Sequence, residues 1–147
     1  MSATRIYLVR HARAEATNPG GDAARRITPD GRTAFETHVR NLKGSLAVTR
    51  VVASPFARCR ETAQVLASFL GVRADSEVEL SSGFSDARQL LRIAARNGPG
   101  TALVGHNPEL AGAVASLAGR ALDFPPGAIA ALDVVGAELR LAWIRVP

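Results

Sequence analysis

Short apolar runs alternate along this chain with longer segments that carry helix-start and helix-stop signals. Residues 5–10, 50–53 and 101–104 have the length and composition of strands buried on both faces. Near-continuous apolar strands of this kind are typical of parallel sheets, in which helices cover both faces. The alternation therefore predicts an α/β fold with three layers, α/β/α, around a mostly parallel central sheet.

The segments between these runs predict where helices begin and end. Thr28 and Ser54 each precede a proline, a pairing that favours the first turn of a helix. Ser85 and Asn107 are the corresponding start signals further along the chain. The expected helices cover residues 29–42, 55–70, 86–96 and 108–118, with a short strand at 73–79 and a C-terminal β-hairpin formed by residues 128–135 and 138–146.

Length and composition limit the class of protein. The 147 residues, 47% of them apolar, are enough for one domain with a real core, and we expect a single domain over residues 1–147. No apolar stretch approaches the roughly 20 residues of a membrane helix. The N-terminus runs directly into the first strand, so we expect no signal peptide. Cys59 is the only cysteine, which excludes an intrachain disulfide and favours a cytoplasmic protein.

The formal net charge of +5 comes almost entirely from arginine, because Lys43 is the only lysine. Positive charge can indicate nucleic-acid binding, but these arginines are spread along the chain without a basic run. We therefore expect neither a nucleic-acid nor a membrane partner. The planar guanidinium group binds phosphate oxygens in a fork, so some of these arginines are candidates for an anion site.

Two histidines directly follow predicted strands. His11 comes after Arg10 at the end of the first strand, and His106 follows the run at residues 101–104. Ligands of open α/β sheets bind at the carboxyl ends of strands, so both side chains are expected at one edge. A neutral imidazole can attack phosphorus, and the charge of Arg10 disfavours the imidazolium form of its neighbour. His38, in the middle of a predicted helix, is expected at the surface.

Two predicted helix starts supply further anion-binding groups. Arg58 lies in the first turn after Ser54-Pro55, where backbone amides and the helix dipole favour negative charge. His106 stands just before another helix start and could donate a hydrogen bond to a phosphoryl oxygen. No carboxylate or cysteine stands at metal-ligand spacing from the two histidines, so we expect no metal.

Three segments, taken in order, resemble the motifs of the histidine phosphatase superfamily, also called phosphoglycerate mutase-like. They are Arg10-His11-Ala12, Ser54-Pro55-x-x-Arg58-x-x-x-Thr62-Ala63 and Gly105-His106-Asn107-Pro108. A fourth segment, Asp22-x-x-Arg25-Arg26-Ile27-Thr28-Pro29-x-Gly31-Arg32, is similar to one in the short SixA-type phosphohistidine phosphatases.

The resemblance implies a phosphoglycerate mutase-like fold and a phosphatase. It makes His11 the phosphorylated nucleophile, Arg10 and Arg58 the clamp on the phosphoryl oxygens, and His106 the group that completes the pocket. It implies no metal and no organic cofactor. Water then hydrolyses the phosphohistidine and releases inorganic phosphate.

The proton donor bears on the substrate. Glu79 aligns with a Glu of the SixA branch and is a possible general acid, although it sits in no clear acid motif. An alkoxide leaving group needs such an acid, whereas an imidazole, with a pKa of about 6.5, does not depend on one. A chain this short also has little room for a lid. These points favour phosphohistidine on a protein, such as a histidine phosphotransfer-type domain; the alternatives are a phosphomonoesterase for a small metabolite and a non-catalytic phosphate-binding module.

Overall fold

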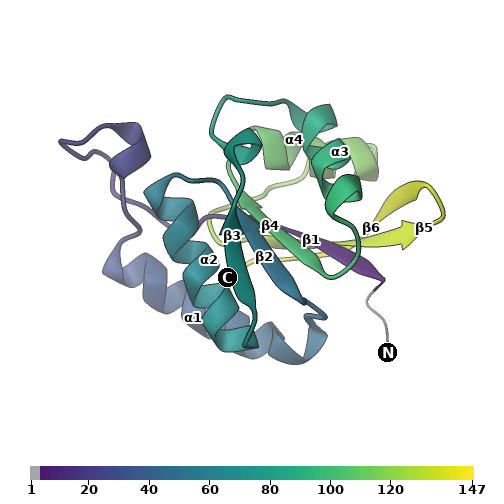
Figure 1. Ribbon diagram of the computed structural model, residues 1–147, viewed down its shortest axis with the longest axis horizontal. Helices are drawn as coiled ribbons and strands as arrows, with labels where there is room; N and C mark the ends of the chain where they lie inside the picture. Colours follow the sequence, from purple (N-terminus) through teal and green to yellow (C-terminus); the bar gives the residue numbers. More distant parts are fainter. Residues whose placement is uncertain (1–3) are drawn as a thin grey trace.

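A single six-stranded sheet runs through the computed structural model, which describes residues 4–147 (Figure 1). The expectation of no signal peptide concerns residues 1–3 and lies outside that range. The strand order is β3-β2-β4-β1-β5-β6; the first four strands are parallel, and the last two form an antiparallel hairpin. The strands are β1 (Arg5–Arg10), β2 (Arg50–Ala53), β3 (Arg73–Ser76), β4 (Thr101–Gly105), β5 (Ile129–Val135) and β6 (Glu138–Arg145).

Four helices cover the two faces of the sheet. Helices α1 (Pro29–Leu42) and α2 (Ala57–Leu70) pack on one face, and α3 (Ala87–Asn97) and α4 (Glu109–Ala118) pack on the other (Figure 1). Alternate side chains of β1 enter the two cores, as the pleat requires: Tyr7 faces α1 and α2, and Leu8 faces α3 and α4. No helix among residues 4–147 is long and apolar enough to cross a bilayer. Three short 3₁₀ turns complete the described part of the chain: η1 (Asp22–Ala24), η2 (Lys43–Ser45) and η3 (Val78–Leu80).

The predicted fold class is confirmed, and the differences are local. Thr28 caps α1 as predicted, with its hydroxyl accepting from Gly31 N at 2.9 Å. Helix α2 begins at Ala57, later than predicted, with Phe56 as its N-cap residue; the buried Ser54 hydroxyl accepts from Phe56 N at 3.2 Å. Asp86, rather than Ser85, caps α3 by accepting from Gln89 N at 2.8 Å. The prediction that His38 lies at the surface is wrong: it is buried under the Arg145 backbone of β6, and burial lowers its pKa.

Strand register brings the predicted site segments to one edge of the sheet. Arg10 lies opposite Gly105 where β1 and β4 pair, and Ala53 lies opposite Val104 where β2 and β4 pair. His11 N continues the ladder by donating to Gly105 O at 3.2 Å. The residues that follow β1, β2 and β4 therefore leave the sheet side by side.

Thr62 on α2 connects this edge to the helix above it. Its hydroxyl accepts from Ala12 N at 2.9 Å and donates to Arg58 O at 2.7 Å, and the side chain is fully buried. One hydroxyl thus joins the residue after His11 to the turn that carries Arg58.

We expect Thr62→Val to lower the free energy of unfolding by about 2 kcal/mol, because the buried Ala12 N–H loses its acceptor while the side-chain volume is kept. Urea denaturation measures the change. Thr62→Ser keeps the hydroxyl and removes one methyl group, so it should cost only about 1 kcal/mol. A valine variant as stable as the wild type would contradict the role of this hydroxyl.

Candidate active site

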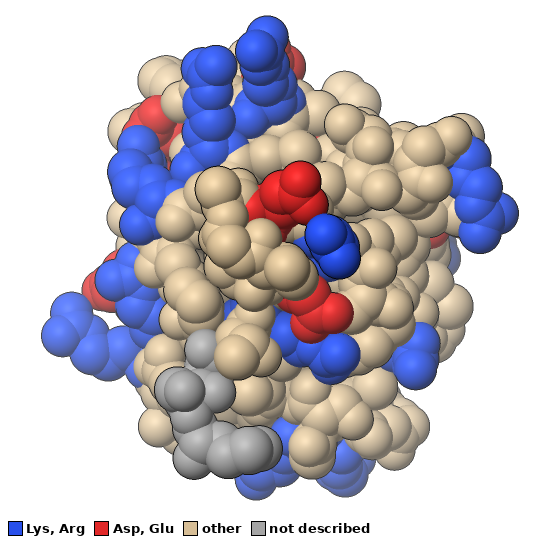
Figure 2. All heavy atoms as spheres, turned by 90° about the vertical axis from the view of Figure 1, so that its right-hand side faces the viewer, with Lys and Arg blue, Asp and Glu red and all other residues tan. Residues whose placement is uncertain are grey.

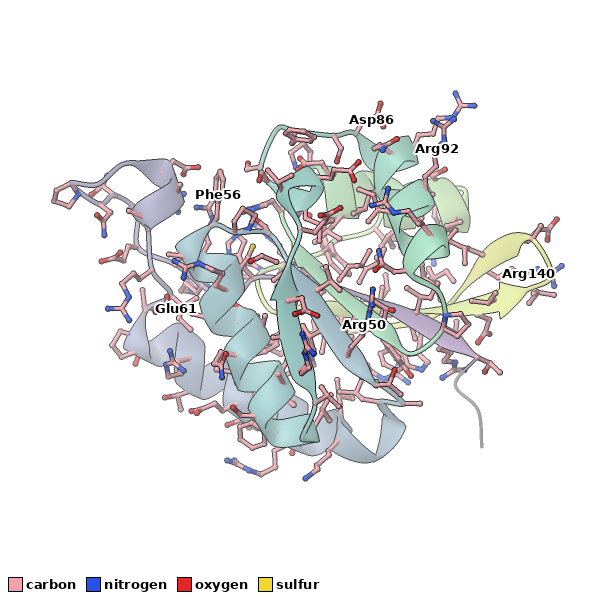
Figure 3. All side chains as sticks on the ribbon, viewed as in Figure 1. Arg50, Phe56, Glu61, Asp86, Arg92 and Arg140 are labelled. Atoms are coloured by element: carbon pink, nitrogen blue, oxygen red, sulfur yellow. The ribbon has the colours of Figure 1, made fainter. Side chains whose placement is uncertain are left out.

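The structure brings together four side chains that the sequence singled out. The ring centroids of His11 and His106 are 5.6 Å apart, with planes inclined at 59°. Arg10 and Arg58 both carry charge close enough to lower the pKa of each imidazole. The four groups come from the ends of β1 and β4 and from the first turn of α2. Phe56, labelled in Figure 3 at the start of α2, packs against His106 and Arg58.

His11 has one ring nitrogen fixed by the backbone. Its Nδ1 lies 2.7 Å from Ala12 O, and a carbonyl oxygen can only accept a hydrogen bond. Nδ1 therefore carries the proton, which leaves the lone pair on Nε2. Burial lowers the pKa of His11 to about 4, with Arg58 and Arg10 acting in the same direction against the Ala12 hydrogen bond. At neutral pH the ring is a neutral nucleophile with a defined attacking nitrogen.

Residues of α2 and of the turn before it hold His106 in place. Its Nε2 lies 2.9 Å from Ser54 Oγ, and that hydroxyl accepts from Phe56 N at 3.2 Å. The Phe56 ring packs edge-on against the imidazole at 5.0 Å, and Cys59 Sγ lies 3.5 Å from Nε2. Burial, followed by the charge of Arg58, lowers the pKa of His106 to about 3, so this ring is also neutral.

Each of the two arginines has one buried N–H donor, the Nε–H, that no described residue accepts. Arg58 is 4% exposed; its Nη1 donates to Asp22 O at 2.8 Å, and its guanidinium lies 5.1 Å from the centre of the Phe56 ring. Arg10 donates through Nη1 to Phe124 O at 3.2 Å. The Nε–H of each is buried and has no hydrogen-bond partner among residues 4–147. A buried donor without an acceptor costs about 1–3 kcal/mol, so an oxygen-rich anion is the ligand that this site fits.

Sequence reasoning assigned no role to Asp22, which supports Arg58 from the segment between β1 and α1. Its carboxylate lies 3.3 Å from Arg58 Nη2 and 2.9 Å from Arg25 Nη1, and Arg25 is the main cause of its lowered pKa. Glu61 on α2 fixes the same segment by accepting from Arg26 Nη2 at 2.7 Å and from Ile27 N at 3.0 Å. The motif that contains Asp22 and Arg25 could be recognised in the sequence, but the sequence did not show that Asp22 holds Arg58.

Glu79 lies in η3 among charged and polar side chains. Its carboxylate accepts from Arg96 Nη2 at 2.9 Å and from Gln89 Nε2 at 3.2 Å. Arg96 is the main cause of the lowered pKa of Glu79. This setting favours the ionised carboxylate, which has no proton to donate. The role of general acid stays a prediction from the sequence, and the environment of this residue does not favour it.

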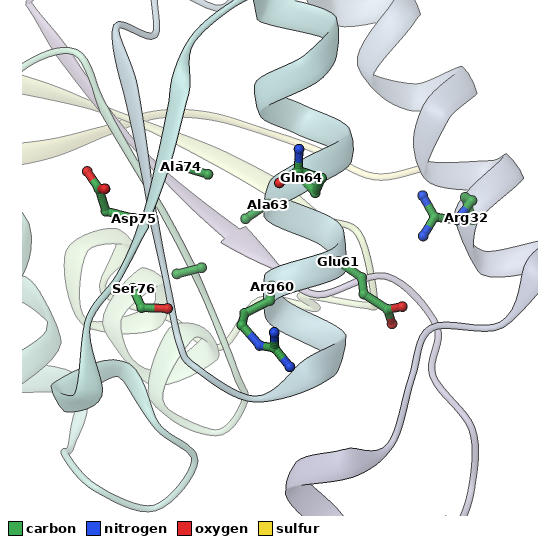
Figure 4. Close-up of a pocket in the computed structure, with 9 residues that line it drawn as sticks. Arg32, Arg60, Glu61, Ala63, Gln64, Ala74, Asp75 and Ser76 are labelled. Carbon is green, nitrogen blue, oxygen red and sulfur yellow. The ribbon is translucent and has the colours of Figure 1, made fainter.

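A separate hollow of about 350 Å³ lies between α2 and β3 (Figure 4). Arg60 and Gln64 of α2, Asp75 and Ser76 of β3 and Arg32 of α1 contribute to its wall. Neither His11 nor His106 lines it, so it is not part of the imidazole site. Among residues 4–147, no group of three His, Cys, Asp or Glu side chains is placed to hold a metal ion.

We expect His11 to titrate with a midpoint near pH 4, well below its ordinary value of 6.5. The folded state favours the neutral ring, so this group's contribution to stability is complete above about pH 6.5 and is lost as pH falls through about 4. Nitrogen NMR of the imidazoles should show Nδ1 protonated and Nε2 unprotonated at pH 7. A midpoint near 6.5, or the opposite tautomer, would contradict the burial and the Ala12 hydrogen bond.

Comparison with known proteins gives one family. The model of the histidine phosphatase superfamily (branch 1) matches residues 6–88, more than half of the chain. That match includes Arg10, His11 and Arg58, whereas His106 lies beyond it and is joined to the site by geometry. No curated protein matches the chain.

Solved structures agree over the whole chain. A candidate phosphohistidine phosphatase SixA from Agrobacterium tumefaciens is 26% identical, with a TM-score of 0.84 over 100% of both chains. A second candidate SixA, from Nakamurella multipartitia, is 26% identical, with a TM-score of 0.76 over 100% of this chain and 99% of the other. A protein histidine phosphatase SixA complexed with tungstate, 22% identical, shares the fold with a TM-score of 0.80 over 95% of both chains. The predicted fold and the predicted enzyme class, a phosphatase, are thereby confirmed, and the chain belongs to the histidine phosphatase superfamily.

Proposed function

We propose that this phosphatase transfers a phosphoryl group from a protein-borne phosphohistidine to His11 Nε2 and then hydrolyses it to inorganic phosphate. The observation that carries the proposal is the pair of buried Nε–H donors, on Arg10 and Arg58, beside two imidazoles that are neutral at pH 7. Such a site combines a nucleophile with preorganised donors for the oxygens of the transferred group.

In the first step, the Nε2 lone pair of His11 attacks phosphorus while the bond between phosphorus and the substrate nitrogen breaks. Charge spreads over the phosphoryl oxygens as the group transfers. Arg10 and Arg58 donate to these oxygens without reorganisation, because Phe124 O already holds Nη1 of Arg10 and Asp22 already holds both Nη atoms of Arg58. With the Ser54 hydroxyl donating to Nε2, the ring proton of His106 lies on Nδ1, and this N–H donates one further hydrogen bond to a phosphoryl oxygen.

The substrate's own chemistry removes the need for a strong acid. A phosphorylated imidazole can take up a proton on its other nitrogen beforehand, and it then leaves as a neutral ring. An ester would expel an alkoxide, which needs a proton from a general acid. Because Arg96 favours ionised Glu79, the environment of the one suggested acid supports phosphohistidine over a phosphate ester.

In the second step, water attacks phosphorus and the bond to His11 Nε2 breaks, which restores the neutral ring and releases phosphate. The protons of the water remain with the phosphate and the solvent. The same donors on Arg10 and Arg58 serve both steps, because the phosphoryl oxygens occupy one position throughout.

Access to the site also favours a substrate borne by a protein. His11 is 8% exposed and His106 is 3% exposed, so the reacting groups are recessed. An imidazole on a side-chain stem can carry its phosphoryl group into such a recess while the rest of the carrier stays outside. Two structures with 26% identity to this chain are candidate phosphohistidine phosphatases, which supports the same substrate class.

His11→Ala should reduce phosphate release from free phosphohistidine and from a phosphorylated histidine phosphotransfer domain by at least about a thousandfold, because no other group replaces the nucleophile. A coupled phosphate assay measures the rate. His38→Gln is the matched control, since it removes a histidine outside the site, and it should keep turnover near the wild-type level.

Three results would contradict the proposal. Substantial turnover by the His11→Ala variant would exclude the nucleophile. Faster release from sugar phosphates or nucleotides than from phosphohistidine would indicate a metabolite phosphomonoesterase. Phosphate binding by the wild type without turnover of any of these compounds would indicate a binding module.

A further inference from the structure

An exposed apolar and basic surface lies where β3 connects to α3. Phe84 is 60% exposed and Val78 is 59% exposed, the two largest values among the large hydrophobic side chains that the structure describes as exposed. Phe84 borders a groove of about 560 Å³ whose other walls are Ser85, Asp86, Arg88, Gln89 and Arg92. In Figure 3, Asp86 and Arg92 point outward from the top of the molecule.

Helix α3 turns unpaired positive charge toward this groove. Arg88 and Arg92 are exposed and one turn apart, whereas Leu90 and Ile93 on the other side of the helix are buried. Helix α3 contains no acidic residue. Arg96 is paired with Glu77 and Glu79, but neither Arg88 nor Arg92 forms a salt bridge or a side-chain hydrogen bond within the described part of the chain. Figure 2 shows basic side chains at the top of the molecule, the level of α3 in Figure 1, with acidic side chains beside them.

This surface lies at the same edge of the sheet as the imidazoles. Strand β3 runs parallel to β2, which runs parallel to β4, so residues 77–86 leave the sheet at the carboxyl edge. Helix α3 then packs on α4, where a side chain at Gly112 would come within 3.1 Å of Ala87 Cβ. Helix α4 begins three residues after His106. Because α3 packs on α4, the surface on α3 belongs to the pair of helices that adjoins the imidazole site.

We propose that Phe84, Arg88 and Arg92 form the docking surface for an acidic face of the protein that carries the phosphohistidine, with an apolar side chain of that face seated on Phe84. The inference rests on the proposed function and adds the chemistry of the partner. Aromatic and arginine side chains are enriched in protein interfaces, and two unpaired guanidinium groups are complementary to carboxylates. In the proposed mechanism the side chains of the site act on the phosphoryl group, so selection among carriers depends on the surface around the site.

The test compares two synthetic phosphohistidine peptides of equal length. One has Asp, Glu and Leu around the phosphohistidine, and the other has Lys in place of the acidic residues. The wild type should prefer the acidic peptide by about tenfold in kcat/KM, mainly through KM. Arg92→Glu should abolish or reverse this preference, and Phe84→Ala should raise KM for the acidic peptide. Turnover of free phosphohistidine should stay the same in both variants.

Arg140→Glu is the matched control, since it changes the net charge equally on the β5–β6 hairpin (Figure 3). It should leave the peptide preference within about twofold of the wild type, because screening at physiological salt limits long-range effects. An unchanged preference in both Arg88→Glu and Arg92→Glu would overturn the docking surface while leaving the phosphatase proposal intact. Binding of phosphatidylglycerol vesicles that is lost in these variants, with peptide kinetics unaffected, would also overturn it. No turnover of any phosphohistidine compound would instead overturn the proposed function.

Discussion

Two guanidinium groups, one half-buried and one buried, held beside two buried imidazoles are the constraint on which the rest of the site depends. Burial, with the charge of Arg58, lowers the pKa of Arg10, and both arginines help to keep His11 and His106 neutral. Concentrated positive charge with reduced access to solvent is unfavourable, and a phosphoryl group relieves it by supplying negative charge and hydrogen-bond acceptors. The same arrangement therefore keeps the nucleophile free and draws in the group that it attacks.

The backbone imposes this arrangement before any side chain is considered. Parallel pairing of β1 with β4 and of β4 with β2 brings three strand ends to one edge. The Ala12 carbonyl then sets the His11 tautomer, and the Thr62 hydroxyl joins that strand end to the first turn of α2. Phe124 O holds Nη1 of Arg10 and Asp22 holds both Nη atoms of Arg58, while the Nε–H of each arginine has no partner among the described residues. Every group in the site is thus placed by a contact to the main chain or to a neighbour that the fold fixes.

The sequence predicted the parts of this account that depend on local pattern. Apolar runs that end in Arg10-His11 and Gly105-His106 indicated both the parallel sheet and the edge of that sheet at which the candidate site lies. The contacts of Asp22 and Ser54 could not be predicted, because they join segments that are 36 and 52 residues apart in the chain. The prediction for His38 was wrong for a related reason: the residue is buried and interacts with the backbone of Arg145 at the end of β6, which no helical pattern around residue 38 reveals. Local periodicity predicts elements, whereas the partners of single polar side chains are set by how those elements meet.

The most direct test of the central claim is to locate the phosphoryl group during turnover. The enzyme is mixed with phosphoramidate, quenched in base after a few milliseconds to seconds, and examined by mass spectrometry and phosphorus NMR. The account predicts one phosphoryl group, on Nε2 of His11, that disappears on mild acid treatment. A phosphoryl group on Nδ1 or on another residue, or continued turnover with no phosphorylated enzyme at any time, would contradict it.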